Sequence, residues 1–244
     1  LILLLCLLVL CLAAGGTAYA LLRQKVRAIQ AGAEFDFSYT VTSPAAETPA
    51  LYGVLQQAGA AQGTVSGQYA PGKFQFALTS GKTGNAFTRV YIDAKETLYD
   101  AGQLYTYLRN EVVSAAPLAG LVLPGWSMGS YISQTQLASL LGVDDTATSL
   151  QSMNDFQLDL KKIKKVQPEN AKEGYLYFRL ETDDTAADSP VLTLGVEKSG
   201  LLRAASPAVH ILLDIPAHGI HTELTGTVTP AAPTLTAPTS RMQD

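Results

Sequence analysis

The feature that most constrains the fold of this chain is a series of short segments in which apolar and polar residues alternate. In the first of them, Phe35–Val41, every second residue is apolar. Successive side chains of a β-strand point to opposite faces, so this period predicts a strand with one buried face. The segments follow one another through connections too short for crossover helices, and strands joined in this way pair antiparallel. The pattern therefore excludes a parallel α/β sheet.

Further strands are expected along most of the remaining chain, separated by turn residues such as Asp93–Lys95 and Asp100–Gly102. They comprise a hairpin over 63–80, short strands over 86–92, 96–99 and 103–107, a strand over 156–163 with a bulge at 161–162, strands over 175–180 and 192–196, and a final hairpin of 208–215 and 220–229. This number of strands predicts a large sheet.

Helices are expected at 48–58, at 108–116 and at 133–142, where Ser133 and Gln136 form a capping box. Helices this few cannot cover both faces of a large sheet. The predicted fold class is therefore α+β: a large curved antiparallel sheet, or incomplete barrel, with a few helices packed on its one apolar face.

The segment Leu1–Leu22 carries no charged residue. A helix of this length rises about 1.5 Å per residue and spans the roughly 30 Å hydrocarbon core of a bilayer. We therefore expect a transmembrane helix or signal anchor. Ala18–Ala20 matches a small-residue cleavage site, so a secretory signal removed after Ala20 is the alternative. The apolar run continues beyond that site, which favours the uncleaved anchor.

The side of the membrane on which the domain lies is predicted from composition. Arg23, Lys25 and Arg27 follow the apolar segment and by themselves favour a cytoplasmic domain. Both cysteines, Cys6 and Cys11, lie within the apolar segment, and the rest of the chain is rich in Thr, Ser, Ala, Gly and Tyr. This composition suits an exported domain and excludes a disulfide framework or a Cys-based zinc site there. We expect the domain on the extracytoplasmic side of the cell membrane.

The chain divides into an anchor over 1–22, a linker over 23–33, a β-rich domain over 34–229 and a Pro- and Thr-rich tail over 230–244 that is expected to be extended. The formal net charge is −4, and every charged residue lies outside the anchor. Phosphate neutralisation supplies most of the affinity of nucleic-acid binding, so a mildly acidic domain is not expected to bind nucleic acid.

The order of these elements over Phe35–Thr229 resembles the envelope carrier proteins of the LolA and LppX type. In those proteins an incomplete barrel wraps helices and shelters a lipid or an acyl chain. The resemblance lies in the layout, and no functional residue is carried over from it. It implies a non-enzymatic binding or structural domain without a cofactor, which shelters a lipid or another apolar ligand. A scaffold that binds a partner protein is a further alternative, for which the sequence specifies no surface.

An enzymatic alternative comes from Gly125–Gly129, which match the G-x-S-x-G motif of α/β-hydrolases. The candidate catalytic residues are Ser127, Asp183 or Asp184, and His210 or His218. They follow the chain order of those enzymes and would make the protein a membrane-tethered serine hydrolase. Pro124 interrupts the expected strand-to-turn junction, no oxyanion loop precedes it, and the surrounding strands are antiparallel. These features favour a Gly-rich loop instead.

The final hairpin brings a second candidate site together. Pairing Ile215 with Ile220 keeps apolar residues on one face and places His221 opposite Asp214, with Glu223 nearby. His and carboxylate ligands on one face suit Zn²⁺ or another divalent ion. A solvated cross-strand pair is the alternative, and it is the more common arrangement.

Two further groups of residues have a functional and a structural interpretation. The lysines Lys161, Lys162, Lys164 and Lys165 form the strongest basic cluster. They would contact anionic headgroups or protect an edge strand from pairing with another chain, and the second interpretation is favoured. The tyrosines at 105, 107, 175 and 177 would line a groove, but Tyr is also common on half-exposed strands.

Overall fold

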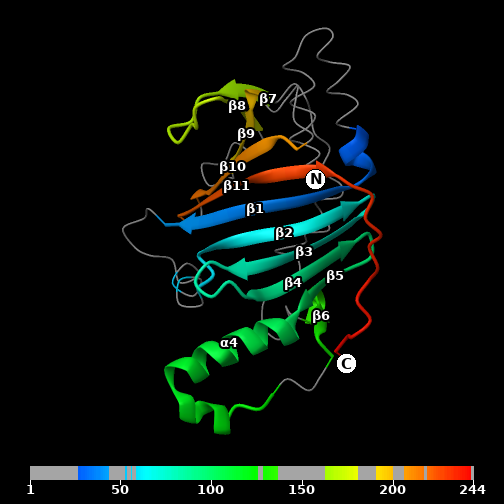
Figure 1. The fold of residues 1–244 in the computed structure, drawn as a ribbon, viewed down its shortest axis with the longest axis vertical. Helices are drawn as coiled ribbons and strands as arrows, with labels where there is room; N and C mark the ends of the chain where they lie inside the picture. The colour runs from blue at the N-terminus through cyan, green and yellow to red at the C-terminus, as the bar shows by residue number, and fades with distance from the viewer. Residues whose placement is uncertain are drawn as a thin grey trace.

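One open antiparallel sheet dominates the structure, a computed structural model that describes residues 27–43, 53, 56, 59–125, 129–136, 163–180, 191–199, 206–216 and 219–242. Its eleven strands follow the order β6-β5-β4-β3-β2-β1-β11-β10-β9-β8-β7 (Figure 1). The strands are β1 Ala33–Thr42, β2 Gln62–Ala70, β3 Lys73–Ser80, β4 Ala86–Asp93, β5 Thr97–Asp100, β6 Tyr131–Ser133, β7 Ile163–Val166, β8 Tyr175–Leu180, β9 Val191–Glu197, β10 Ala208–Ile215 and β11 Ile220–Pro230. The helices α4, Ala101–Ala115, and η1, Pro117–Leu121, lie between β5 and β6.

The first and last strands meet in the middle of the sheet. β1 pairs with β2 on one side and with β11 on the other, where Phe37 lies opposite Gly226. Two meanders, β1–β6 and β7–β11, are thereby joined into one sheet. β6 and β7 are the outermost of the described strands at its two ends and do not pair with each other, so the sheet is not closed into a barrel.

The two faces of the sheet differ, as the alternating sequence predicts. Along β1 the side chains of Glu34, Asp36 and Ser38 are exposed, whereas Phe37 and Tyr39 are buried. The buried apolar residues of β1, β9, β10 and β11 form the main core. Its members are Ile29, Ala33, Phe37, Leu194, Val196, Val209, Ile211 and Val228. Ile29 belongs to a short helix at 27–31 that packs on this face.

The C-terminal tail runs in extended form along the strand ends, at the right edge of Figure 1. Its Leu235 is buried against Tyr91 and Leu98, which form a second apolar cluster with it. Beyond Leu235 the tail reaches β6, where Tyr131 and Arg241 form a parallel bridge. The expected extended tail is confirmed, and it packs on the sheet.

Most predicted strands are confirmed. The hairpin over 63–80 is β2 and β3, and the final hairpin has the predicted register, with Ile215 opposite Ile220 and Asp214 opposite His221. The capping box is confirmed as well: the backbone N–H of Ser133 donates to the Gln136 amide oxygen at 2.9 Å, and that of Gln136 to the Ser133 hydroxyl at 3.1 Å. The large antiparallel sheet with few helices is therefore as expected.

The strand predicted over 103–107 is wrong, because these residues belong to α4. The carboxylate of Asp100 accepts the backbone N–H of Gln103 at 2.8 Å, so Asp100 is a helix N-cap and not a turn residue. Asp favours both positions, and the short apolar run around Leu104 does not distinguish a strand from a helix. The helix expected over 108–116 is the second half of α4.

Several predictions lie outside the described residues: the apolar segment 1–22, most of the helix at 48–58, and the strand and bulge at 156–162. Among the residues that the structure does describe, no helix is long and apolar enough to cross a membrane.

Candidate functional site

The apolar face of the sheet carries large side chains that are only partly buried. Phe35, Val65 and Leu224 pack against the main core and keep part of their surface accessible, as do Leu176 and Leu192 nearer the β7 edge. Open apolar surface of this kind is costly in water. The face can therefore receive an apolar ligand as well as a packing element.

Two glycines shape this face. A Cβ at Gly67 would lie 2.7 Å from the ring of Phe35, and a Cβ at Gly226 would lie 2.7 Å from the ring of Phe37. The aromatic rings of β1 thus lie over neighbouring strands at positions without a side chain. The surface beside β1 is therefore formed by aromatic rings that cover the two glycines.

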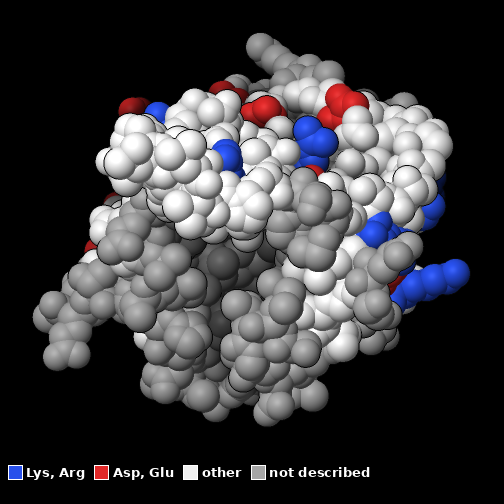
Figure 2. All heavy atoms as spheres, turned by 90° about the horizontal axis from the view of Figure 1, so that it is seen from below, with Lys and Arg blue, Asp and Glu red and all other residues white. Residues whose placement is uncertain are grey.

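Figure 2 shows the molecule from below, with the acidic and basic side chains of the described residues coloured. Acidic and basic side chains are interspersed over the described surface in this view. No extended field of one sign is visible on this side, in agreement with the small net charge of −4.

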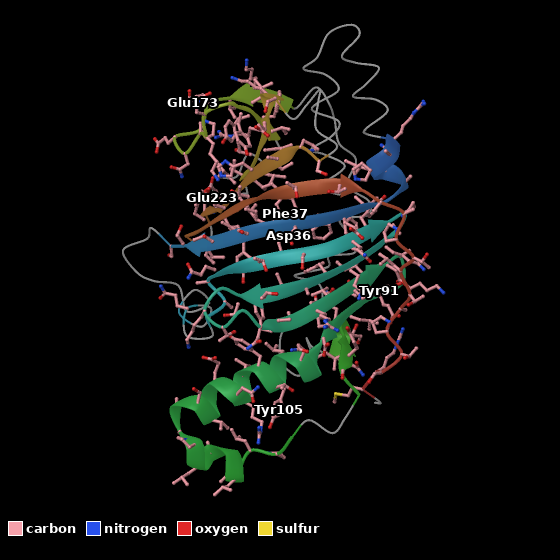
Figure 3. The ribbon with its side chains drawn as sticks, viewed as in Figure 1. Asp36, Phe37, Tyr91, Tyr105, Glu173 and Glu223 are labelled. Atoms are coloured by element: carbon pink, nitrogen blue, oxygen red, sulfur yellow. The ribbon has the colours of Figure 1, made fainter. Side chains whose placement is uncertain are left out.

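A buried polar network occupies the opposite face, where β8, β9, β10 and β11 lie side by side. His210 is fully buried, and its ring joins the hydroxyl of Tyr177, 2.7 Å from Nδ1, to the carboxylate of Glu223, 2.8 Å from Nε2. Lys172 makes two contacts with this network. Its backbone N–H donates to the Tyr177 oxygen at 2.7 Å, and its side-chain ammonium lies 3.2 Å from Glu223. The ammonium also donates to Thr225 at 2.6 Å. In Figure 3, Glu223 lies below the β7–β8 loop that carries Glu173.

The network fixes the protonation of His210. A carboxylate only accepts hydrogen bonds, so Nε2 carries the proton and donates to Glu223, and the Tyr177 hydroxyl donates to Nδ1. Burial, together with the Lys172 ammonium, lowers the pKa of His210 from 6.5, and Glu223 opposes this shift. Burial alone would raise the pKa of Glu223, but the hydrogen bonds and charges of Lys172 and His210 together outweigh it and lower that pKa. The network therefore holds a neutral imidazole beside an ionised carboxylate.

This arrangement serves to attach the β7–β8 loop to the sheet. Glu223 and Lys172 reach the solvent, with side chains 37% and 39% exposed. Both ring nitrogens of His210 are engaged and no face of the ring is accessible, so His210 has no free position from which to act as a base on a substrate. Ser127, Asp183, Asp184 and His218 lie outside the described residues.

The predicted pair His221 and Asp214 is present: Nδ1 of His221 is hydrogen-bonded to the Asp214 carboxylate. Glu223, the third residue of the candidate metal site, is bound to His210 and Lys172. Within the part of the chain that the structure describes, no three His, Cys, Asp or Glu residues are grouped so that they could hold a metal ion.

The lysines and tyrosines are placed as follows. Lys164 and Lys165 are exposed on β7, the outermost described strand at one end of the sheet, which is the position that the interpretation as edge protection expects; Lys161 and Lys162 lie outside the described residues. Tyr107 is buried against Phe87. Tyr105 donates to the Pro124 carbonyl at 2.9 Å. The four tyrosines therefore do not share one groove.

A shallow polar hollow of about 510 Å³ lies over the central strands on the exposed face. Its polar lining includes Glu34, Asp36, Gln68, Gln75 and Arg89. Among the described residues, its lining contains no His, Cys or Lys, but it includes the hydroxyls of Ser66, Thr227 and Thr229. It offers hydrogen-bond donors and acceptors over an open surface.

Lys172 was not predicted from the sequence, because it lies in a loop and its partners come from two strands that are far apart in the chain, β8 and β11. Tyr177 on β8 and His210 on β10 lie on either side of β9. The residue of β9 that pairs with both of them is Gly195. The signal that could have revealed the contact is this glycine, which becomes informative once the order of the strands is known.

No family model matches the chain, and no curated protein is similar to it at a significant level.

Proposed function

We propose that this chain is a non-enzymatic binding domain, held at the cell membrane through residues 1–22 on the extracytoplasmic side, which shelters a lipid acyl chain or a similar apolar ligand on the apolar face of its sheet. The observation that carries the proposal is the set of large, partly buried side chains on that face, with Phe35, Val65 and Leu224 at its centre. An acyl chain has no polar group to satisfy, and it would bury this surface at a gain of roughly 25 cal/mol per Å².

Two further features support a binding role over catalysis. The buried His210 has both nitrogens engaged within the fold, and among the described residues the lining of the polar hollow on the other face contains no His, Cys or Lys. The resemblance in layout to the LolA and LppX carriers adds the same expectation. An open sheet with one apolar face is also the kind of scaffold on which an apolar ligand is enclosed between strands and helices.

The experiment is photo-crosslinking of the full chain in vesicles that contain a diazirine-labelled fatty acid or phospholipid. Peptide mapping by mass spectrometry then locates the adducts. We expect adducts on residues 1–22, from the anchor, and separately on β1 and β2, from the sheltered ligand. Adducts confined to 1–22 would refute the ligand-binding part, and a chain that does not associate with vesicles would refute the membrane location.

A matched pair of variants on β2 separates the two faces. Val65→Gln places an amide on the apolar face and is expected to remove most of the β1 and β2 adducts. Ser66→Gln changes the neighbouring residue on the polar face and is expected to leave them unchanged. Thermal unfolding of both variants checks that each one folds. Equal adduct yields in the two folded variants would contradict a ligand on the apolar face.

A further inference from the structure

The exposed large hydrophobic residues of the described chain are confined to one projection. They are Leu104, Leu108, Val112, Leu118, Leu121 and Val122, here called the apolar tip. Leu118, Leu121 and Val122 are 78%, 86% and 80% exposed, far above the partly buried residues of the sheet. In Figure 1, α4 and η1 extend away from the sheet at the lower end of the molecule.

The apolar tip is continuous along α4. Leu104, Leu108 and Val112 are spaced by four residues and so form one stripe along the helix, and the buried Tyr107 lies beside it. η1 then places Leu118 and Leu121 beyond the end of that stripe. An amphipathic helix normally buries such a stripe against its own protein, whereas this one faces outward.

The tip carries no free charge. The sequence contains no Asp, Glu, Lys or Arg between Glu111 and Asp144. The two charged residues of α4 are both engaged: Glu111 binds Lys82 at 2.6 Å, and Arg109 donates to the carbonyl of Leu123 at 3.0 Å. The side chains of the tip cannot form ion pairs with a partner. A partner that binds this surface must therefore be apolar itself.

The backbone of the tip is hydrogen-bonded within the protein. Arg109 also donates to the carbonyl of Gly120, and the hydroxyl of Tyr105 donates to that of Pro124 at 2.9 Å. The N–H groups of Val122 and Leu123 both donate to the Ala119 carbonyl. In hydrocarbon an unsatisfied backbone group costs several kcal/mol, so a non-helical turn can enter a bilayer only with such partners. Arg109 and Tyr105 supply them from α4.

We propose that the apolar tip is a membrane-insertion site, through which the α4–η1 projection enters the hydrocarbon of a lipid bilayer. The tip is a convex projection and not a groove, its six side chains are uncharged, and the carbonyls of Ala119, Gly120, Leu123 and Pro124 are hydrogen-bonded within the protein. The inference rests on the membrane location in the proposed function and adds a second point of contact, separate from residues 1–22. Arg109 acts as a positioning residue that keeps the turn closed.

The experiment uses the full chain in phosphatidylcholine nanodiscs, with Cys6→Ser and Cys11→Ser as the background. A single cysteine, at Leu121→Cys on the tip or at Asp36→Cys on the exposed polar face of β1, carries an NBD fluorophore. Doxyl-labelled lipids quench NBD only where it is in contact with hydrocarbon. We expect strong quenching and a blue-shifted emission at 121, and neither at 36.

Each other outcome contradicts the inference. An unquenched fluorophore at 121 in a chain that incorporates into nanodiscs overturns the insertion site and leaves the anchor intact. Quenching at both positions indicates that the domain lies non-specifically on the bilayer. Disulfide formation between two copies at 121 without quenching assigns the tip to self-association. A chain that fails to incorporate refutes the membrane location itself, so the two proposals fail in distinguishable ways.

Discussion

The hydroxyl of Tyr177 on β8 is hydrogen-bonded to Nδ1 of His210 on β10, 2.7 Å away, across the intervening strand β9. The contact is possible because Gly195 of β9 stands between them without a side chain, and the Tyr177 ring lies over it. A Cβ at Gly195 would come within 2.4 Å of that ring. One hydrogen bond thus links the two strands that lie on either side of β9.

Gly195→Ala is therefore expected to destabilise the domain by about 1–3 kcal/mol, because the methyl group overpacks against a ring that cannot move away. Thermal or urea-induced unfolding of the full chain in detergent measures the loss. Gly125→Ala is the matched control, since a Cβ there meets nothing within 4 Å. Equal stability of the two variants would show that the Tyr177 ring does not lie over β9.

Removing the hydroxyl in Tyr177→Phe leaves two buried groups without a partner, Nδ1 of His210 and the backbone N–H of Lys172. We expect a loss of about 1–3 kcal/mol in the free energy of unfolding. Tyr105→Phe removes a hydroxyl whose hydrogen bond to Pro124 is exposed, where water can replace it, and is expected to cost less. A similar loss in both would argue against a buried network.

The lowered pKa of His210 predicts an acid-sensitive domain. Its pKa lies below 6.5 in the folded chain and near 6.5 in the unfolded chain, so between these two values the unfolded chain binds more protons. The free energy of unfolding is unaffected by this group above pH 6.5 and falls as the pH drops below it. Glu223 adds a second loss at lower pH, because its lowered pKa stabilises the fold only while it is ionised.

Melting temperatures recorded from about pH 8 to pH 5 measure this dependence. His210→Gln, which cannot titrate, is expected to be less stable at pH 8 but to lose less stability between pH 6.5 and 5. Parallel curves for the variant and the natural chain would show that His210 titrates normally, and therefore that it is not held neutral by burial.

The tail contributes through packing more than through charge. Leu235→Ala removes a side chain that is 5% exposed and packed on Tyr91 and Leu98, and is expected to cost about 2–4 kcal/mol. Arg241→Ala breaks a two-bond contact with Glu96, but the pair lies at the surface and is expected to contribute less than about 1 kcal/mol. Figure 3 shows Tyr91 beside the tail. A larger loss of stability for Arg241→Ala than for Leu235→Ala, measured by thermal unfolding, would show that the tail is held by its ion pair.

The alternating pattern was sufficient to predict the strands that have one apolar and one polar face. The register of β10 and β11 followed from pairing Ile215 with Ile220, because a shift by one residue would turn every apolar side chain to the wrong face. The pattern gave a wrong prediction at 103–107. The exposed apolar residues of α4 recur every four residues, but the segment from 103 to 107 is too short to show this spacing, and Asp100 was assigned to a turn.

The sequence by itself therefore determined local structure, the antiparallel pairing of neighbouring strands and the uncharged character of residues 112–143, since these depend on residues close together in the chain. Only the tertiary structure decided that β1 lies beside β11, that Lys172 reaches His210 through Tyr177 and Glu223, and that Leu104, Leu108 and Val112 face outward. The physical reason is that a contact between distant segments depends on strand order and on which surface each helix covers. Both result from the packing of the whole sheet, and no local pattern encodes them.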